Sequence, residues 1–238
     1  MIATVVIPTY NEKNTIKKTI QKVFSQKIPD VKLNIIVVDD NSPDGTAKIA
    51  KKFKNVFVLS RPCKMGLGSA YLAGFKKAFE MNADVVFEMD ADLSHDPKYL
   101  KDFIKDIKEG SDVVIGSRYI DGGGNDWPIS RKIVSKGANI LAKIILWLPA
   151  KDSTSGYRCY KTSILKKIDF SKFFTKGYAF QEEMLYYCFK KGAKISEIPI
   201  FFPNRKSGAS KLKISEISRF PFQLLKVRFF SENSKSKD

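Results

Sequence analysis

The chain has 238 residues, enough for one large domain with a sizeable hydrophobic core. Its 42 Lys and Arg residues outnumber its 25 Asp and Glu residues, which gives a net charge of +17, and 43% of its residues are hydrophobic. The apolar content is ordinary for a globular protein, and no run of 18 apolar residues predicts a membrane span. The positive charge favours a polyanionic partner, which nucleic acid, an anionic membrane face or a phosphorylated substrate would each satisfy.

The three cysteines and the N-terminus indicate a reducing compartment. Cys63, Cys159 and Cys188 are odd in number and widely spaced, without a metal-binding pattern. We therefore expect free, partly buried thiols and neither a disulfide framework nor a zinc site. The first eight residues lack a basic segment and enter a strand directly, so no signal peptide is expected.

Strands and helices alternate in the first half of the chain. Continuous apolar, largely β-branched runs predict buried strands at residues 2–7, 33–38, 56–59, 85–89 and 112–116. Helical periodicity or turn chemistry predicts helices at residues 16–24, 46–53, 67–79 and 100–107. This alternation predicts an α/β fold with a mostly parallel central sheet and helices on both faces.

The pattern changes after residue 119. A glycine-rich loop at residues 121–126 and a basic segment precede an apolar stretch at residues 138–148. A loop that returns to a strand is expected at residues 152–160, followed by a helix at 181–190 and a strand at 195–202. Residues 1–230 are expected to form a single domain, and residues 231–238 a polar, frayed tail.

Asp90-Ala91-Asp92, at the end of the predicted strand 85–89, is the most informative motif. On a strand, Asp90 and Asp92 would project to the same side, and two close carboxylates repel each other unless a cation lies between them or one is protonated. At the carboxyl end of a strand in an α/β sheet, oxygen ligands favour Mg²⁺ or Mn²⁺ together with a diphosphate. A glycosidase-like acid and base pair is the rival interpretation, but it needs a wider separation than this spacing provides.

A series of short motifs in fixed order resembles those of inverting family-2 glycosyltransferases with the GT-A (Rossmann-like) fold. The narrower resemblance is to dolichol- or polyprenol-phosphate mannose synthases, and it extends from residue 4 to about residue 213. The motifs lie at residues 8–12, 38–46, 66–68, 90–92, 116–119, 153–158 with 177–181, and 205–211.

The resemblance implies a nucleotide-sugar site and a metal site. The residues that it assigns to the nucleotide sugar are Pro8, Tyr10, Glu12, Val38, Asp40, Asp90, Ala91, Asp92, Arg205 and Lys211. Asp92 is the principal ligand of Mg²⁺ or Mn²⁺ and Asp90 assists it. Some relatives have a Gln ligand at the position of Ser94, which is a weaker ligand and is left as a possible one. Asp39 is as well explained as a structural turn residue.

The resemblance also implies the reaction, which is transfer of mannose from GDP-mannose to a dolichyl or polyprenyl monophosphate. Because the acceptor oxygen is already anionic near neutral pH, no strong general base is needed, and His95, the only histidine, is interpreted as structural. The hard tasks are to hold two anions together and to stabilise the leaving diphosphate. The catalytic residues implied are Asp92, Arg118, Arg205 and Lys211. Arg118 and, more weakly, Arg131 are candidates for the acceptor phosphate, and the loop 205–211 for closing over the diphosphate.

Two segments of the second half are candidates for amphipathic helices at a membrane interface. Residues 140–148 combine apolar side chains with Trp147 and flanking lysines, and residues 214–230 combine aromatic, aliphatic and basic side chains with an interruption at Pro221. Packing of both segments on the sheet is the alternative. We expect a peripheral protein on the cytoplasmic side of a membrane, without a transmembrane helix and with a possible membrane-anchoring partner subunit.

Three alternatives are weighed against this hypothesis. A dinucleotide-dependent oxidoreductase would carry glycines after the first strand, where residues 8–12 have none. A nucleic-acid-binding protein would explain the charge, but no recognition motif is present and the aspartate loops would repel phosphates, so nucleic acid is not an expected partner. A polyprenyl-phosphate glucosyltransferase that uses UDP-glucose remains the nearest rival.

Overall fold

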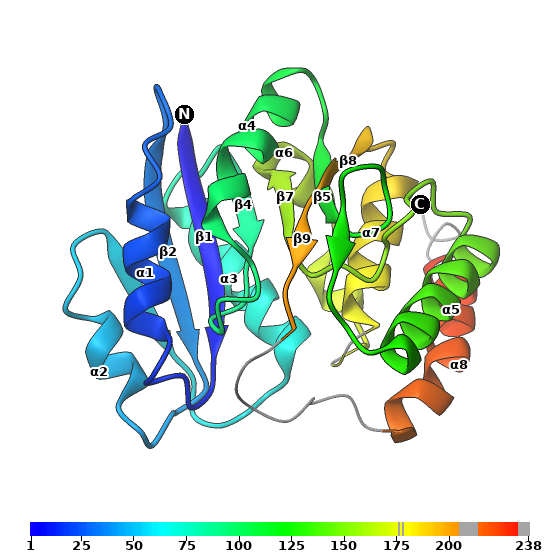
Figure 1. The fold of residues 1–238 in the computed structure, drawn as a ribbon, viewed down its shortest axis with the longest axis horizontal. Coiled ribbons are helices and arrows are strands. Elements are labelled where there is room, and N and C mark those ends of the chain that lie inside the picture. Colours follow the sequence, from blue (N-terminus) through cyan, green and yellow to red (C-terminus); the bar gives the residue numbers. More distant parts are fainter. Residues whose placement is uncertain (176, 178, 205–213, 233–238) are drawn as a thin grey trace.

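The structure is a computed structural model of the chain, and it describes residues 1–175, 177, 179–204 and 214–232 (Figure 1). Its centre is a seven-stranded sheet in the order β3-β2-β1-β4-β7-β5-β8, and β6 and β9 form a separate two-stranded sheet. The strands are β1 (Ile2–Thr9), β2 (Lys32–Asp39), β3 (Val56–Ser60), β4 (Val85–Glu88), β5 (Val113–Ser117), β6 (Gly124–Asn125), β7 (Arg158–Lys161), β8 (Ile195–Pro199) and β9 (Phe201–Phe202).

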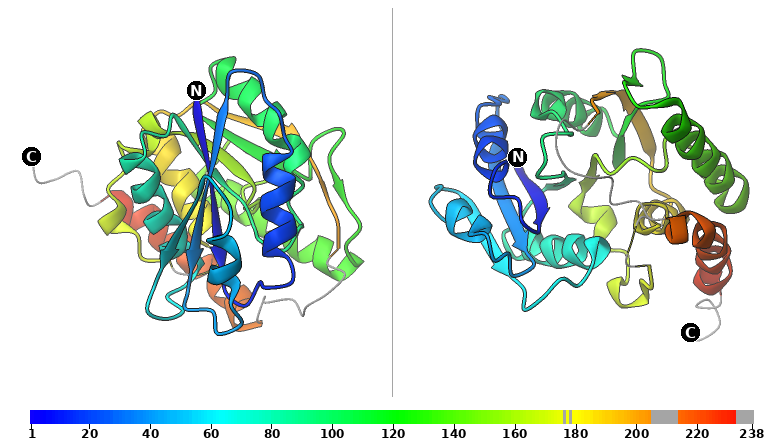
Figure 2. Two further views of the ribbon diagram at one scale, coloured as in Figure 1. Left: turned by 90° about the vertical axis from the view of Figure 1, so that its left-hand side faces the viewer. Right: turned by 60° about the horizontal axis from the view of Figure 1, so that its bottom comes forward.

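Helices cover both faces of the large sheet (Figure 2, left). The longer helices are α1 (Ile16–Phe24), α3 (Leu67–Glu80), α4 (Leu100–Lys108), α5 (Ile129–Leu146), α7 (Phe180–Lys190) and α8 (Ile214–Glu232). The shorter ones are α2 (Thr46–Ala50), α6 (Thr162–Leu165), and the 3-10 turns η1 (Pro97–Tyr99) and η2 (Phe170–Lys172). The predicted α/β fold with helices on both faces is therefore confirmed.

The two faces follow from the alternation of side chains along each strand. In β1, Val5 and Ile7 belong to the hydrophobic cluster that contains α1 and α4, whereas Val6 belongs to the cluster that contains α3 and α7. Both faces of β1 are fully buried, which is why the sequence there is a continuous apolar run.

The sheet is parallel except for β7, which pairs antiparallel with β4 and β5. Parallel pairing of β1 with both β2 and β4 brings the carboxyl ends of these three strands to one edge of the sheet, at the bottom of Figure 1. The predicted strand at residues 195–202 is divided into β8 and β9, and β9 leaves the large sheet to pair with β6. The predicted helix at residues 46–53 ends at Ala50.

In the second half both long helices extend further than the sequence indicated, and the interruption expected at Pro221 is wrong. The basic segment and the apolar stretch are one continuous helix, α5, which ends where Trp147 adopts a left-handed backbone conformation with φ of 54°. Pro221 does not interrupt the last helix, because α8 continues through it. Helices α5 and α8 lie side by side (Figure 1), and Arg228 donates from Nη1 to the Ile145 carbonyl over 3.0 Å. Residues 233–238 of the predicted tail lie outside the described residues.

Charged side chains are buried inside the fold beside β4 and β7. Arg158 is fully buried and donates hydrogen bonds to the main-chain carbonyls of Ser155 (2.7 Å), Ser153 and Gln181 (2.6 Å). Burial raises the pKa of Glu88 to about 7 and that of Glu182 to about 8, and in both cases the opposing charge of Arg158 limits the rise. One guanidinium thus balances two carboxyl groups in a region that excludes water.

Close packing of α3 on β1 generates a stability prediction. A Cβ atom on Gly74 would lie 2.3 Å from Val6 Cγ1, whereas a Cβ atom on Gly137 of α5 would meet nothing within 4 Å. We expect Gly74→Ala to lower the free energy of unfolding by about 1–3 kcal/mol through overpacking. The matched control Gly137→Ala should raise it by about 0.5–1 kcal/mol, since alanine is the better helix former. Chemical denaturation measures both, and equal effects would contradict the packing argument.

The raised pKa of Glu182 predicts a pH dependence of stability. Because the native state holds the proton more tightly than the unfolded state, where the ordinary pKa of about 4.5 applies, the stabilisation is complete below that value. The free energy of unfolding should then decrease as the pH rises toward 8, by at most about 1.4 kcal/mol per pH unit for this group. Glu182→Gln should flatten the profile between pH 5 and pH 8.

The control for this experiment is Glu80→Gln, which removes an exposed carboxylate that pairs with Lys77 on α3. It should retain the wild-type slope. An unchanged slope in Glu182→Gln would contradict a protonated, buried carboxyl group at this position.

Candidate active site

The acidic motif lies beyond the end of a strand, not on it. Strand β4 ends at Glu88, and Asp90, Ala91 and Asp92 belong to the bend that follows. The predicted direction of both carboxylates rests on strand alternation, and this reason is wrong because neither residue lies on the strand. The bend still lies at the carboxyl edge of the sheet, since β4 pairs directly with β1.

His95 anchors the bend from inside the fold. Its Nδ1 accepts a hydrogen bond from the Asp90 main-chain N–H (3.0 Å), and its Nε2 lies 3.9 Å from Asp90 Oδ2. The ring is 2% exposed and stacks on Tyr157, with 4.7 Å between centroids. These contacts agree with the structural interpretation of His95.

Local hydrogen bonds orient the second aspartate. Asp92 Oδ1 accepts from the Ser94 main-chain N–H (2.9 Å), and the Ala91 carbonyl accepts from Thr19 Oγ1 of α1 (2.8 Å). Ala91 and Ser94 are both buried, whereas the Asp90 side chain is one-third exposed. The carboxylates of Asp90 and Asp92 thus belong to one short bend, two positions apart in the chain, and Ser94 is hydrogen-bonded to Asp92 through its main chain.

Of the predicted residues, Pro8 lies near the end of β1, and Tyr10 and Glu12 lie in the loop that follows. The Tyr10 ring is 37% exposed, and Lys64 Nζ lies 4.8 Å from its centroid. Glu12 accepts from Thr15 Oγ1 (3.0 Å) while its main-chain N–H donates to Thr46 Oγ1 (3.0 Å), so this loop is fixed to the N-cap of α1 and to the first residue of α2. An exposed aromatic ring at the end of β1 is suited to stacking on a base or ribose.

Asp39, the last residue of β2, and Asp40 after it are both held by hydrogen bonds within the protein. Asp39 accepts from Thr9 Oγ1 (2.9 Å) and from Ser42, which agrees with the turn role proposed for it. Asp40 pairs with Arg61 (2.6 Å) and accepts from the Met65 main-chain N–H (3.2 Å). The Val38 side chain is packed in the core, so only its main chain is left for a ligand.

Arg118, which follows β5, is held in a buried ion pair. Its Nε and Nη2 donate to the two carboxylate oxygens of Asp152 over 2.7 and 2.6 Å, and Nη2 also donates to Thr154 Oγ1 (2.6 Å). Burial alone would lower the pKa of the guanidinium, but the Asp152 carboxylate outweighs it and raises the pKa. Arg118 is thus a fixed cation, two of whose nitrogens are already engaged.

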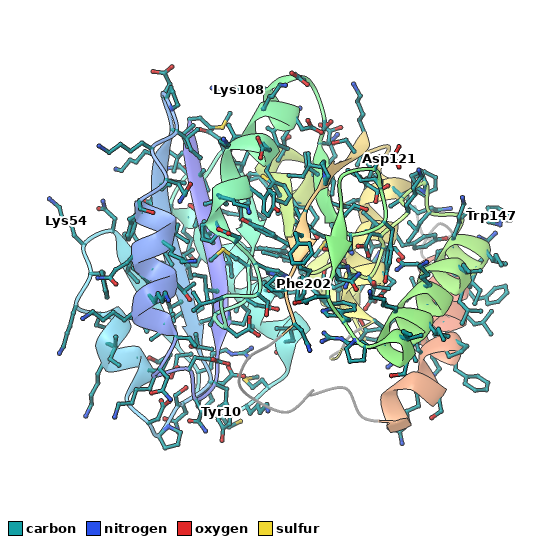
Figure 3. All side chains as sticks on the ribbon, viewed as in Figure 1. Tyr10, Lys54, Lys108, Asp121, Trp147 and Phe202 are labelled. Carbon is teal, nitrogen blue, oxygen red and sulfur yellow. The ribbon has the colours of Figure 1, made fainter. Side chains whose placement is uncertain are left out.

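Of the other three predicted cations, the structure describes only Arg131. Arg131 lies in the first turns of α5, with its guanidinium carbon 3.7 Å from the centroid of the Trp127 indole. Arg205 and Lys211 lie outside the described residues, and their assigned roles stay predictions. Figure 3 labels Phe202 near the centre of the view, with Tyr10 below it and Trp147, at the end of α5, to its right.

Sequence reasoning missed several residues that organise this site. They are Arg61, Trp127, Asp152 and Arg158. Arg61, Asp152 and Arg158 each take part in a hydrogen bond with a residue 21 or more positions away in the chain. Trp127 contacts the nearby Arg131 through its aromatic ring, and the sequence around this ring is ordinary. A signal existed only for Asp152 and Arg158, which lie within or next to the motif at residues 153–158.

A metal ion would need oxygen ligands from a substrate to complete its shell. Over the part of the chain that the structure describes, no group of three or more His, Cys, Asp and Glu side chains is close enough to hold a metal. Two neighbouring carboxylates without soft ligands suit Mg²⁺ or Mn²⁺, which are commonly bound through one or two carboxylates and substrate phosphates. The residues present therefore fit a divalent metal that arrives with a diphosphate.

Comparison with known proteins identifies close relatives. The chain is 39% identical over 226 residues to the polyprenol monophosphomannose synthase of Mycolicibacterium smegmatis. The matched region covers 92% of this chain and 84% of that protein. The chain is also 40% identical over 212 residues to the undecaprenyl-phosphate mannosyltransferase of Micrococcus luteus, covering 87% and 86% of the two chains.

A solved structure supports the fold. The glucosyl-3-phosphoglycerate synthase of Mycobacterium tuberculosis, in complex with Mn²⁺, UDP-glucose and phosphoglyceric acid, superposes with a TM-score of 0.68 at 18% identity over 96% of this chain and 78% of that chain. Its magnesium complex with UDP superposes with the same score over 94% of this chain and 77% of that chain. The family model for glycosyl transferase family 2 matches residues 4–169. The chain is therefore a member of glycosyl transferase family 2.

Proposed function

We propose that this chain transfers mannose from GDP-mannose to a dolichyl or polyprenyl monophosphate, with inversion at the sugar carbon. The observation that carries the proposal is the identity of about 40% to two polyprenyl-phosphate mannosyltransferases over most of the chain. The acidic bend, the Tyr10 loop and the cations Arg118 and Arg131 are compatible with a nucleotide diphosphate on one side and a second phosphate on the other.

The reaction needs little proton chemistry. An acceptor phosphate oxygen attacks the anomeric carbon from the side opposite the diphosphate; the new C–O bond forms as the bond to the leaving diphosphate breaks. Since the attacking oxygen is already anionic, no residue has to remove a proton. This agrees with His95 being fully engaged inside the fold.

Electrostatic compensation is the main task of the protein. Asp90 and Asp92, with Ser94 beside them, would hold Mg²⁺ or Mn²⁺ next to the diphosphate. When bound, the metal supplies positive charge that stabilises the leaving group. In our proposal Arg118 and Arg131 bind the acceptor phosphate, while Arg205 and Lys211 bind the diphosphate.

We further propose that the enzyme works as a peripheral protein at the cytoplasmic membrane face. Exposed apolar side chains lie along α5 and α8, among them Ile144 (64% exposed), Trp147 (67%) and Phe229 (58%), and lysines interrupt them on both helices. Such a mixture suits the interface between lipid chains and headgroups. Among the described helices, none is long and apolar enough to cross a membrane.

The donor is tested by thermal-shift titration. We expect GDP-mannose with Mn²⁺ to raise the melting temperature more than UDP-glucose does, because a ligand stabilises the native state according to its affinity. A larger shift with UDP-glucose would favour a polyprenyl-phosphate glucosyltransferase. Retention on DNA that a nucleotide sugar leaves undiminished would favour a nucleic-acid-binding protein.

The metal role of Asp92 predicts a large loss of activity. Asp92→Ala should lower the transfer rate by about 100-fold or more while leaving the melting temperature near that of the wild type, because a charge that stabilises the leaving group is lost. The matched control is Asp96→Asn on the same loop, which caps η1 by accepting from the Lys98 N–H (3.1 Å) and should retain activity. Full activity of Asp92→Ala in the presence of a chelator would contradict the metal site.

Membrane attachment through α5 predicts weaker vesicle binding after a charge is introduced. Ile144→Glu should lower the affinity for anionic phospholipid vesicles about tenfold or more, since burial of an isoleucine is worth about 1.5–3 kcal/mol. Phe57→Glu, at another exposed apolar site on the edge strand β3, is the control and should bind as the wild type. Cosedimentation measures both, and equal binding of the two variants would remove α5 from the interface.

A further inference from the structure

Trp127 is the point at which two guanidinium groups meet. It lies between β6 and α5 and is 5% exposed. The guanidinium carbon of Arg131 is 3.7 Å from the centroid of its ring, and that of Arg118 is 4.7 Å away. Guanidinium groups are attracted to the face of an indole, so a single ring fixes the positions of both cations.

The indole N–H of Trp127 is a buried donor. Its Nε1 has no hydrogen-bond partner among the described residues, while the main-chain N–H of Trp127 donates to Asn125 Oδ1 (3.4 Å). An indole N–H only donates, and a buried donor left without a partner is costly. The missing partner must therefore be an acceptor.

The groups around the ring favour a ligand that is rich in acceptors. Guanidinium groups, like the indole N–H, only donate hydrogen bonds. Asp152 accepts two hydrogen bonds from Arg118 and so holds this guanidinium beside the ring. A phosphate, which has only acceptor oxygens when ionised, matches this set of donors better than a sugar hydroxyl does.

Phe202 connects this cluster to the acidic bend. Its ring packs edge-on against Trp127, with 5.2 Å between centroids, and edge-on against His95 at 5.4 Å. His95 in turn accepts the hydrogen bond from Asp90 N–H. Figure 3 shows Phe202 near the middle of the molecule, so the cluster and the metal-binding bend flank one aromatic side chain.

We propose that Trp127 belongs to the acceptor-phosphate site. Its ring positions Arg131 and Arg118, and its Nε1–H donates a hydrogen bond to an oxygen of the acceptor phosphate. The inference rests on the proposed function, because it assigns this phosphate to the acceptor and the acidic bend to the donor.

The test compares two substitutions with two separate substrates. Trp127→Phe keeps an aromatic face without the N–H, and Trp127→Leu removes both. Steady-state transfer is measured with a short-chain, water-soluble prenyl phosphate, so that membrane binding does not enter. Binding of this acceptor and of GDP with Mn²⁺ is measured separately by calorimetry. Phe57→Leu, which removes an exposed aromatic ring on the edge strand β3, is the matched control.

We expect Trp127→Phe to raise the KM for the acceptor about tenfold, and Trp127→Leu about 100-fold, with the KM for the donor and the affinity for GDP within about twofold of the wild type. Partial retention by phenylalanine separates positioning of the arginines from the hydrogen bond, and a purely structural role would not raise one KM alone. Phe57→Leu should leave both KM values unchanged.

Three results would overturn the inference. They are an unchanged acceptor KM in both Trp127 variants, equal losses for the two substrates, and a selective loss of GDP binding, which would assign the cluster to the donor diphosphate. The failure of the proposed function looks different, because the wild-type protein would then neither bind the prenyl phosphate nor transfer sugar to it. If Trp127→Leu does not fold, Trp127→Phe and the acceptor calorimetry still decide.

Discussion

The structure depends on balancing negative charges that lie close together. Carboxylates from the loops after β2 and β4 gather at one edge of the sheet, and the proposed substrates would add two more anions. The protein meets this with cations that are themselves fixed by carboxylates: Arg61 pairs with Asp40, and Arg118 with Asp152. A cation held this way keeps its position without the freedom of a surface side chain, so a phosphate that arrives finds donors already in place.

The same constraint explains the buried layer beneath the site. Arg158 connects the carbonyls of Ser153, Ser155 and Gln181, and so fixes the loop before β7 to the start of α7. Its charge also limits the rise in pKa of Glu88 and Glu182, which burial alone would carry further. Because breaking a buried pair leaves an uncompensated charge, this layer is expected to be rigid, and rigidity under a site favours precise positioning above it.

Aromatic rings couple the two halves of the site. Tyr157 stacks on His95, and Phe202 contacts both His95 and Trp127. The strand β9, which carries Phe202, pairs with β6 just before Trp127, so the small sheet holds the aromatic contact in register. The acidic bend on one side and a pair of arginines on the other are thereby positioned by packing and need no direct hydrogen bond between them.

The sequence by itself determined the α/β class, the strand order along the chain and the acidic motif, because buried parallel strands and turn residues leave local periodic signals. It also placed Tyr10, Asp40, Asp92 and Arg118 in loops at strand ends, through their motifs. Only the tertiary structure decided that β4 ends before Asp90, that α8 continues through Pro221, and that Asp152 engages Arg118. Helix length depends on packing against neighbours, and ion-pair partners are distant in the chain, so no local pattern encodes either. The contacts of Trp127 with Arg118 and Arg131 are close in the chain, but they depend on how the segment between β5 and α5 folds back on itself.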